Sequence, residues 1–81
     1  MSTRFSNEKK FKQWKETGTG NRLYWRRVEG QQGWYAVYYK EVNRVEETIR
    51  FWQEVYNEKG ELEEVHEKFP IDGGHKKIRN L

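Results

Sequence analysis

Cysteine is absent from the 81-residue chain, and proline occurs only once, at Pro70. The lack of cysteine excludes disulfide bonds and cysteine-ligated metal centres, and it fits a reducing compartment. No run of residues is long or apolar enough for a signal peptide or a membrane span. We therefore expect a cytoplasmic protein without a membrane partner, held together by one small core.

Aliphatic residues are scarce as well. Hydrophobic residues make up 33% of the chain and charged residues 36%, a balance that leans toward disorder. Four Trp, five Tyr and four Phe offset the shortage, because each ring buries a large area. We expect one folded domain, residues 1–81, with an aromatic core. The net charge of +3 allows an anionic partner without requiring one.

Four segments rich in β-branched and aromatic residues alternate with turns that contain Gly or Asn, a spacing typical of an antiparallel meander. The last segment also fits helical spacing, so its assignment stays open between strand and helix. The predicted fold class is α+β, mainly β: a four-stranded antiparallel meander within 22–69, with a short N-terminal helix packed on one face. The predicted strands are 22–28, 34–42, 48–56 and 62–69.

A short helix is predicted before the sheet, over residues 7–16, after a flexible N-terminus at 1–6. Ser6 suits the N-cap, and Phe11 and Trp14 lie three apart on one helical face.

Glycines at 18 and 20 end that helix. After the sheet, Pro70 stops the last strand, and residues 72–81 are predicted to form a flexible basic tail.

Turn chemistry predicts a register. Asn57, Glu58, Lys59 and Gly60 form a type I turn pattern that sets Asn57 opposite Glu61. With further loops at 29–33 and 43–47, the odd-numbered residues of all four strands share one face. That face is the predicted core and collects Leu23, Trp25, Tyr35, Val37, Tyr39, Ile49, Phe51, Val55, Val65 and Phe69.

The even-numbered face falls into rows, one aromatic and the next cationic. Bases stack on rings while cations follow phosphates, so this pattern suits single-stranded nucleic acid. A solvated face is the plainer interpretation, and a homodimer interface is a third, because one helix cannot cover two aromatic faces. The candidate ligand-binding residues are Tyr24, Tyr38, Trp52, His66, Arg22, Lys40, Arg50 and Lys68.

Catalytic chemistry has little support. His66 and His75, with Glu54 or Glu64 nearby, are the only set that suits acid–base cleavage of a phosphodiester, and no nucleophile is positioned beside them. Residues 73–77 place glycines beside lysines without the strand, loop and helix of a phosphate loop. We predict no catalytic residue, no metal site and no cofactor.

The aromatic segments resemble parts of two families. The run 33–39 resembles the aromatic strand of the RNA-recognition motif, but Tyr35 stands where a small residue is required and that fold's two helices are missing. A second set resembles the three strands of a WW domain, but Val55 replaces the proline expected after the second Trp. Its members are Trp34, Tyr38, Tyr39, Asn43, Thr48 and Trp52. Neither family is assigned.

The function predicted first is a non-enzymatic binding module whose aromatic and basic sheet face takes an anionic partner, such as single-stranded nucleic acid. The alternative is a homodimeric interaction or structural protein with that face buried between subunits. A small nuclease that uses His66 comes third.

Overall fold

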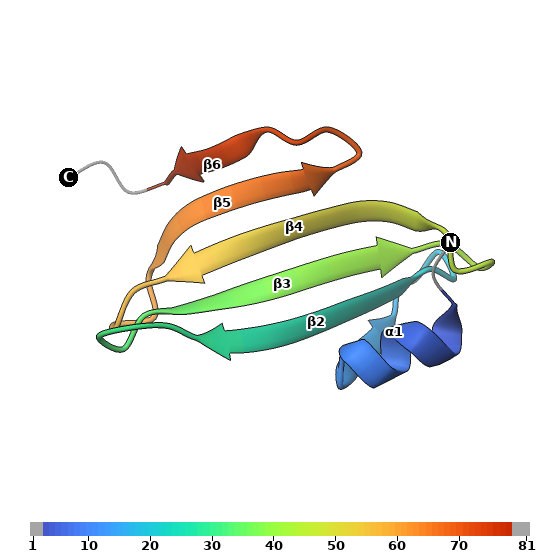
Figure 1. Cartoon of the computed structure of the whole chain (residues 1–81). Coiled ribbons are helices and arrows are strands. Elements are labelled where there is room, and N and C mark those ends of the chain that lie inside the picture. The colour runs from blue at the N-terminus through green and yellow to red at the C-terminus, as the bar shows by residue number, and fades with distance from the viewer. Residues whose placement is uncertain (1–2, 79–81) are drawn as a thin grey trace.

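The computed structural model describes residues 3–78, which form one short helix and a six-stranded antiparallel sheet (Figure 1). Each strand pairs with its neighbours in sequence, so the strands lie in the order β1 to β6. The mainly β class is confirmed, and the number of four strands is wrong because a short strand extends the sheet at each edge. The elements are α1 (Arg4–Lys10), β1 (Gln13–Glu16), β2 (Arg22–Glu29), β3 (Tyr35–Val42), β4 (Thr48–Tyr56), β5 (Leu62–Phe69) and β6 (Gly74–Lys77).

Helix α1 lies earlier in the chain than the predicted 7–16. Thr3 is its N-cap and accepts a hydrogen bond from the backbone of Ser6 at 3.1 Å, so Ser6 belongs to the first turn. Phe11 leaves the helix with extended backbone, and Trp14 lies in β1. Trp14 lies in a strand because β1 gains backbone hydrogen bonds by pairing with the edge of β2. The helical spacing of the two rings contains no signal of that pairing.

Strand β6 occupies part of the predicted basic tail. The carboxylate of Asp72 closes the connection from β5, because it accepts from the backbone of Gly74 at 3.0 Å and contacts His66 at 2.7 Å. The remaining residues of that tail, 79–81, lie outside the described residues, as do residues 1–2 of the predicted flexible N-terminus. Segment 62–69 is a strand, not a helix.

Three of the hairpin loops share one five-residue pattern. The first residue donates its N–H to the carbonyl of the fifth, and the fourth donates to the carbonyl of the first. The predicted pairing of Asn57 with Glu61 is confirmed. The fourth residue has a positive φ in each loop: 85° at Gly20, 64° at Glu46 and 78° at Gly60. These loops are Thr17 to Asn21, Asn43 to Glu47 and Asn57 to Glu61.

The register between β2 and β3 differs by two residues from the predicted one. Tyr24 faces Lys40, not Tyr38. The reason is that the loop closes with a hydrogen bond from Gly30 to Trp34, one residue later on each strand than predicted. A shift of two leaves every side chain on its expected face.

A β-bulge has the larger effect. The pairing of Val42 with Thr48 is as predicted, but the next pair joins Glu41 to Arg50, so Ile49 is an extra residue in β4. One extra residue reverses the alternation of faces beyond it. Tyr39 therefore faces Trp52, and the predicted core of odd-numbered residues is wrong.

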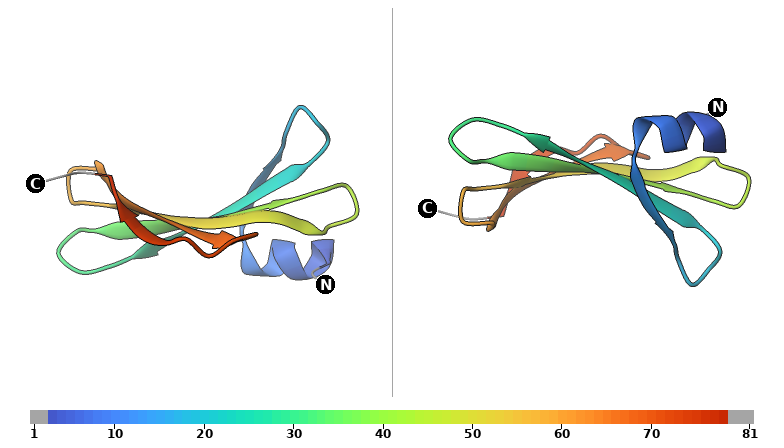
Figure 2. Two further views of the ribbon diagram at one scale, coloured as in Figure 1. Left: turned by 90° about the horizontal axis from the view of Figure 1, so that it is seen from above. Right: turned by 90° about the horizontal axis from the view of Figure 1, so that it is seen from below.

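The two faces of the sheet are distinct surfaces. We call the one that carries α1 the helix-bearing face and the other the bare face (Figure 2). Of the predicted core, Phe51, Val55 and Phe69 lie with the even-numbered residues of β2 and β3 on the helix-bearing face. Leu23, Trp25, Tyr35, Val37, Tyr39 and Val65 lie on the bare face.

The buried core sits at one end of the helix-bearing face. Phe11, Tyr24 and Val42 are buried there, and Tyr38 and Phe51 pack against them. The ring centroids of Phe11 and Tyr24 lie 5.9 Å apart. Within the described residues, no helix is long and apolar enough to cross a membrane.

Candidate functional site

The eight predicted ligand-binding residues do not form adjoining rows. The bulge at Ile49 divides them between the two faces, because it moves the even-numbered residues of β4 to the bare face. On the helix-bearing face lie Arg22, Tyr24, Tyr38, Lys40, His66 and Lys68; on the bare face lie Arg50 and Trp52.

Two of these residues serve the core. Tyr24 is 0% exposed beneath α1, so its ring is not available for stacking with a ligand. Arg22 is buried, and its guanidinium contacts the carboxylate of Glu8 at 2.6 Å. The contact ties α1 to β2.

Trp52 is covered although it lies on the bare face. It stacks on Tyr39 with 4.9 Å between ring centroids and 11° between planes, and the guanidinium of Arg50 lies 4.0 Å from its centroid. Arg50 also pairs with Glu67, and this hydrogen bond lowers the pKa of the Glu67 carboxyl. Only 9% of Trp52 is exposed, so the ring offers little surface to a base.

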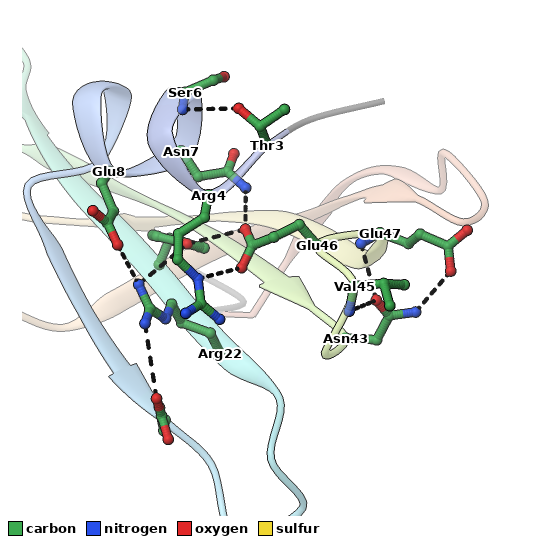
Figure 3. Close-up of polar contacts among 12 residues, drawn as sticks. Thr3, Arg4, Ser6, Asn7, Glu8, Arg22, Asn43, Val45, Glu46 and Glu47 are labelled. Atoms are coloured by element: carbon green, nitrogen blue, oxygen red, sulfur yellow. Dashed lines mark hydrogen bonds and ion pairs between the residues drawn. The ribbon is translucent and has the colours of Figure 1, made fainter.

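A buried polar cluster fastens α1 to the sheet (Figure 3). Glu46 accepts hydrogen bonds from Asn7 Nδ2 at 2.9 Å, Arg4 Nε at 3.2 Å and Tyr24 Oη at 3.1 Å. Burial tends to raise the pKa of the Glu46 carboxyl, but these three hydrogen bonds outweigh burial and lower it. We call this group the Glu46 clasp.

The backbone of Glu46 adopts a conformation that favours glycine. Its φ of 64° is at the loop position where the two equivalent turns have Gly20 and Gly60. A non-glycine residue in the left-handed region costs about 1–2 kcal/mol. The clasp supplies the compensation, because one carboxylate oxygen at this position accepts from Asn7 and Tyr24 while the other accepts from Arg4.

A pocket of about 260 Å³ opens beside α1 on the helix-bearing face. Its lining combines three phenylalanine rings with two lysines, so an apolar interior adjoins positive charge. Lys40 is the one predicted site residue among them. The lining residues are Lys10, Phe11, Lys40, Thr48, Phe51 and Phe69.

Lys40 is the best-defined polar group of the pocket. Its Nζ donates to Asn7 Oδ1 at 2.8 Å, which connects the pocket to the Glu46 clasp. Burial lowers the pKa of Lys40, and the charge of Lys10 lowers it further. Lys68 adds a third cation nearby, since its Nζ lies 5.8 Å from the ring centroid of Phe51.

The remaining pocket residues were not predicted as a site. The sequence predicts Phe51 and Phe69 as core residues, and the hydrophobicity that supports this prediction is equally typical of a pocket wall. Lys10 and Thr48 carry no sequence signal, because α1 and β4 meet only in the folded chain.

His66 and His75 form a pair on the adjacent strands β5 and β6. Their ring centroids lie 4.3 Å apart; Asp72 contacts His66 at 2.7 Å, and Glu64 lies 3.5 Å from His75 Nδ1. His66 Nδ1 is buried and has no hydrogen-bond partner within residues 3–78. The two rings are in contact, and the small nuclease that uses His66 stays a prediction. No group of three His, Asp or Glu in that range suits a metal ion.

The pocket is therefore the candidate functional site, because it combines a concave shape, an apolar surface and positive charge. Comparison with known proteins adds no analogy, since no protein-family model, curated protein or solved structure matches the chain.

Proposed function

We propose that this chain is a non-enzymatic binding module that receives an anionic ligand on its helix-bearing face. The observation that carries the proposal is the pocket beside α1, in which three phenylalanines and two lysines line one cavity. Ligand sites are concave, mostly apolar and equipped with a few polar groups that orient the ligand. The pocket has these properties.

The distribution of charge supports an anion on this face. Both arginines of the bare face that stack on rings, Arg27 and Arg50, are paired with glutamates. More of the cations that make no ion pair within residues 3–78 lie on the helix-bearing side than on the bare face. They make the electrostatic potential on the helix-bearing side more positive and attract anions to it. Those on the helix-bearing side are Lys10, Arg26, Lys40, Lys68 and Lys77, and those on the bare face are Lys15 and Lys76.

Titration with 8-anilinonaphthalene-1-sulfonate tests the proposal, because this dye is an apolar anion that fluoresces when it leaves water. We expect saturable binding to one site. Lys40→Met should weaken it roughly tenfold, the equivalent of one charge-assisted hydrogen bond. Lys77→Met is the matched control, since it removes one charge from the same face at a distance from the pocket.

Partly unfolded proteins also bind this dye, so each variant needs a thermal melt that shows it folded at the titration temperature. Equal binding by Lys40→Met and wild type would contradict the proposal. So would equal affinity for N-phenyl-1-naphthylamine, which has similar rings and no sulfonate.

Single-stranded nucleic acid is the second candidate ligand of this face. Tyr38 lies directly opposite Arg26, and the Nζ of Lys68 lies 5.1 Å from its ring centroid, so a half-buried ring is flanked by two cations. Lys68→Ala should reduce the log–log salt slope of oligonucleotide binding by about 0.7. Arg50→Ala, on the bare face, should leave the slope unchanged. No binding at low salt would exclude this ligand.

The bare face suits a second copy of the chain, which would form a homodimer through it. The chain exposes 5860 Å², whereas a 10.0 kDa monomer typically exposes about 5,200 Å². Sedimentation should show dimers at high micromolar concentration. Val65→Glu, on the bare face, should abolish them, and Val55→Glu, on the helix-bearing face, should not. A monomer at millimolar concentration would contradict the dimer.

A further inference from the structure

The dimensions and charges of the pocket narrow the class of its ligand. We propose that the pocket binds a small amphipathic carboxylate with about ten non-hydrogen atoms. The carboxylate would lie against Lys40 and Lys10, and the apolar body against Phe11, Phe51 and Phe69. This inference rests on the binding function proposed above and specifies its ligand.

The size of the ligand follows from the volume of the pocket. The pocket holds about 260 Å³, below the range of about 300–1,000 Å³ that suits drug-sized molecules. At about 30 Å³ per non-hydrogen atom, the share of a water molecule in the liquid, roughly nine atoms fill it. Octanoate has this size when its carboxylate stays at the mouth of the pocket.

Lys40 is prepared to bind the head group. An ammonium group has three N–H donors, and Lys40 gives one of them to Asn7 at 2.8 Å. The hydrogen bond to Asn7 holds the ammonium in place and leaves donors for a ligand. Lys10 and Lys40 line the same pocket, so an anion bound there is attracted by both; the pKa of Lys40 is lowered by burial first and by the charge of Lys10 second.

The head group should carry a single negative charge. Asn7 connects Lys40 to the carboxylate of Glu46, since it accepts from Lys40 at 2.8 Å and donates to Glu46 at 2.9 Å, and this carboxylate would repel a ligand dianion more strongly than a monoanion. Loss of hydration adds to this preference, because the cost of desolvating an ion grows with the square of its charge. A carboxylate is therefore favoured over a phosphate monoester.

The ring wall selects for an apolar body. Phe11 is almost fully buried in the core, but Phe69 is 43% exposed and gains cover when a ligand lies against it. Each methylene buried in such contacts should tighten binding roughly fourfold, until the pocket is full. The length of the ligand's alkyl chain at which affinity stops rising therefore measures the depth of the pocket.

The test is a titration of the full chain with hexanoate, octanoate, octanol and octyl phosphate, followed by ¹H–¹⁵N correlation spectra. Octanoate should bind tightest, and hexanoate should bind roughly fifteenfold more weakly, the effect of two methylenes. Octanol and octyl phosphate should each bind at least about tenfold more weakly than octanoate. Shifted amides should cluster around the pocket residues.

Variants locate the site. Lys40→Met should weaken octanoate roughly tenfold, and Phe69→Ala should weaken it by a similar factor. Lys77→Met and Ile71→Ala match them in chemistry but lie outside the pocket, so both should bind octanoate like wild type. If Lys40→Met does not fold, Lys10→Met at the end of α1 keeps the test, with about threefold weaker binding expected.

Several results would overturn the inference. Octanol as tight as octanoate would mean that the lysines do not select an anion, and tighter octyl phosphate would mean a phosphate site. Failure of octanoate, with dye binding that still depends on Lys40, would refute the carboxylate and leave the binding function standing. Failure of both probes would refute the two proposals together.

Discussion

The two faces of the sheet protect their aromatic rings by different means. On the helix-bearing face, α1 covers Tyr24, and the Glu46 clasp holds the helix down. On the bare face, no described element covers the rings, and they shield one another. Tyr35 stacks on Tyr56 at 5.1 Å, and Arg27 lies 3.8 Å from the Tyr35 centroid.

The polar groups of the two faces differ in what they connect: on the helix-bearing face they hold a helix, and on the bare face they connect stacked rings. Glu54 joins the two stacked pairs of the bare face, because it accepts from Trp52 Nε1 at 3.1 Å and from the hydroxyl of Tyr56. Burial and this hydrogen bond raise the pKa of Tyr56. The comparison teaches that a single-layer sheet can shield large rings without a second layer, provided that cross-strand stacks and arginines cover them.

The largest difference between the faces should appear on truncation of one tyrosine from each. Tyr24→Ala removes a fully buried ring and should cost about 3–5 kcal/mol of unfolding free energy. Tyr39→Ala removes a half-buried ring that stacks on Trp52 and should cost about 1–2 kcal/mol. Urea denaturation followed by circular dichroism measures both. Equal losses would show that the faces contribute alike.

The Glu46 clasp should account for the next largest effect. Glu46→Gln keeps the size of the side chain but removes the charge that three donors share, which should cost about 2 kcal/mol. The pKa of Glu46 is lowered from its ordinary value of 4.5 in the folded chain, so its contribution is complete above that value. It is lost as pH falls through the folded pKa.

Wild type and Glu46→Gln should therefore differ at pH 7 and converge as the solution becomes strongly acidic. Thermal melts across this range measure the convergence. Glu47→Gln, in the same loop but exposed, is the control and should show neither effect. A constant gap between wild type and Glu46→Gln at every pH would rule out the ionised clasp.

The smallest effect is expected on the bare face. Arg50→Ala loses the contact with Trp52 and the ion pair with Glu67, and should cost about 1 kcal/mol. Acrylamide should then quench Trp52 more strongly. Arg27→Ala is the matched variant, since it uncovers Tyr35 and should leave the quenching of Trp52 as it is. Unchanged quenching in Arg50→Ala would mean that Tyr39 alone shields the indole.

Turn chemistry explains how much of the fold could be predicted. Asn57 and Gly60 determine the last large hairpin, and the pairs beside two loops, Tyr56 with Leu62 and Val42 with Thr48, are as predicted. Two strands, 48–56 and 62–69, have the predicted bounds. Local signals are strong where the backbone conformation itself restricts the residue type.

The rest could not be predicted, because it depends on irregularities in strand pairing that carry no local signal. Ile49 looks like any strand residue, yet its bulge moves Trp52 and Arg50 to the other face. Two further shifts between β4 and β5, at Val55/Tyr56 and Phe51/Trp52, change the alternation again, so His66 lies on the helix-bearing face and Val65 on the bare face. At the candidate site, the sequence predicts Lys40, but it predicts the helix that completes the pocket later in the chain than α1 lies.

Glu46 shows a different limit of prediction from the sequence. A loop of Asn, Arg, Val, Glu and Glu contains no glycine, so the likeness to the two loops with Gly20 and Gly60 is hidden in the sequence. The exception to the turn rule marks the place where the chain accepts local strain for a contact with Asn7, far away in sequence.

The neighbour-to-neighbour pairing of all six strands has a consequence for the order of folding. Every hairpin closes a short loop, so contacts between adjacent strands form at a small entropic cost and the sheet should assemble quickly. Helix α1 has no such advantage, because Asn7 binds Glu46, which is 39 residues away in sequence. The loop that positions Glu46 forms only after β3 and β4 have paired. The helix should dock last and detach first, so its amides should exchange with solvent sooner than those of the central strands. The pocket beside it would then assemble as the final step of folding.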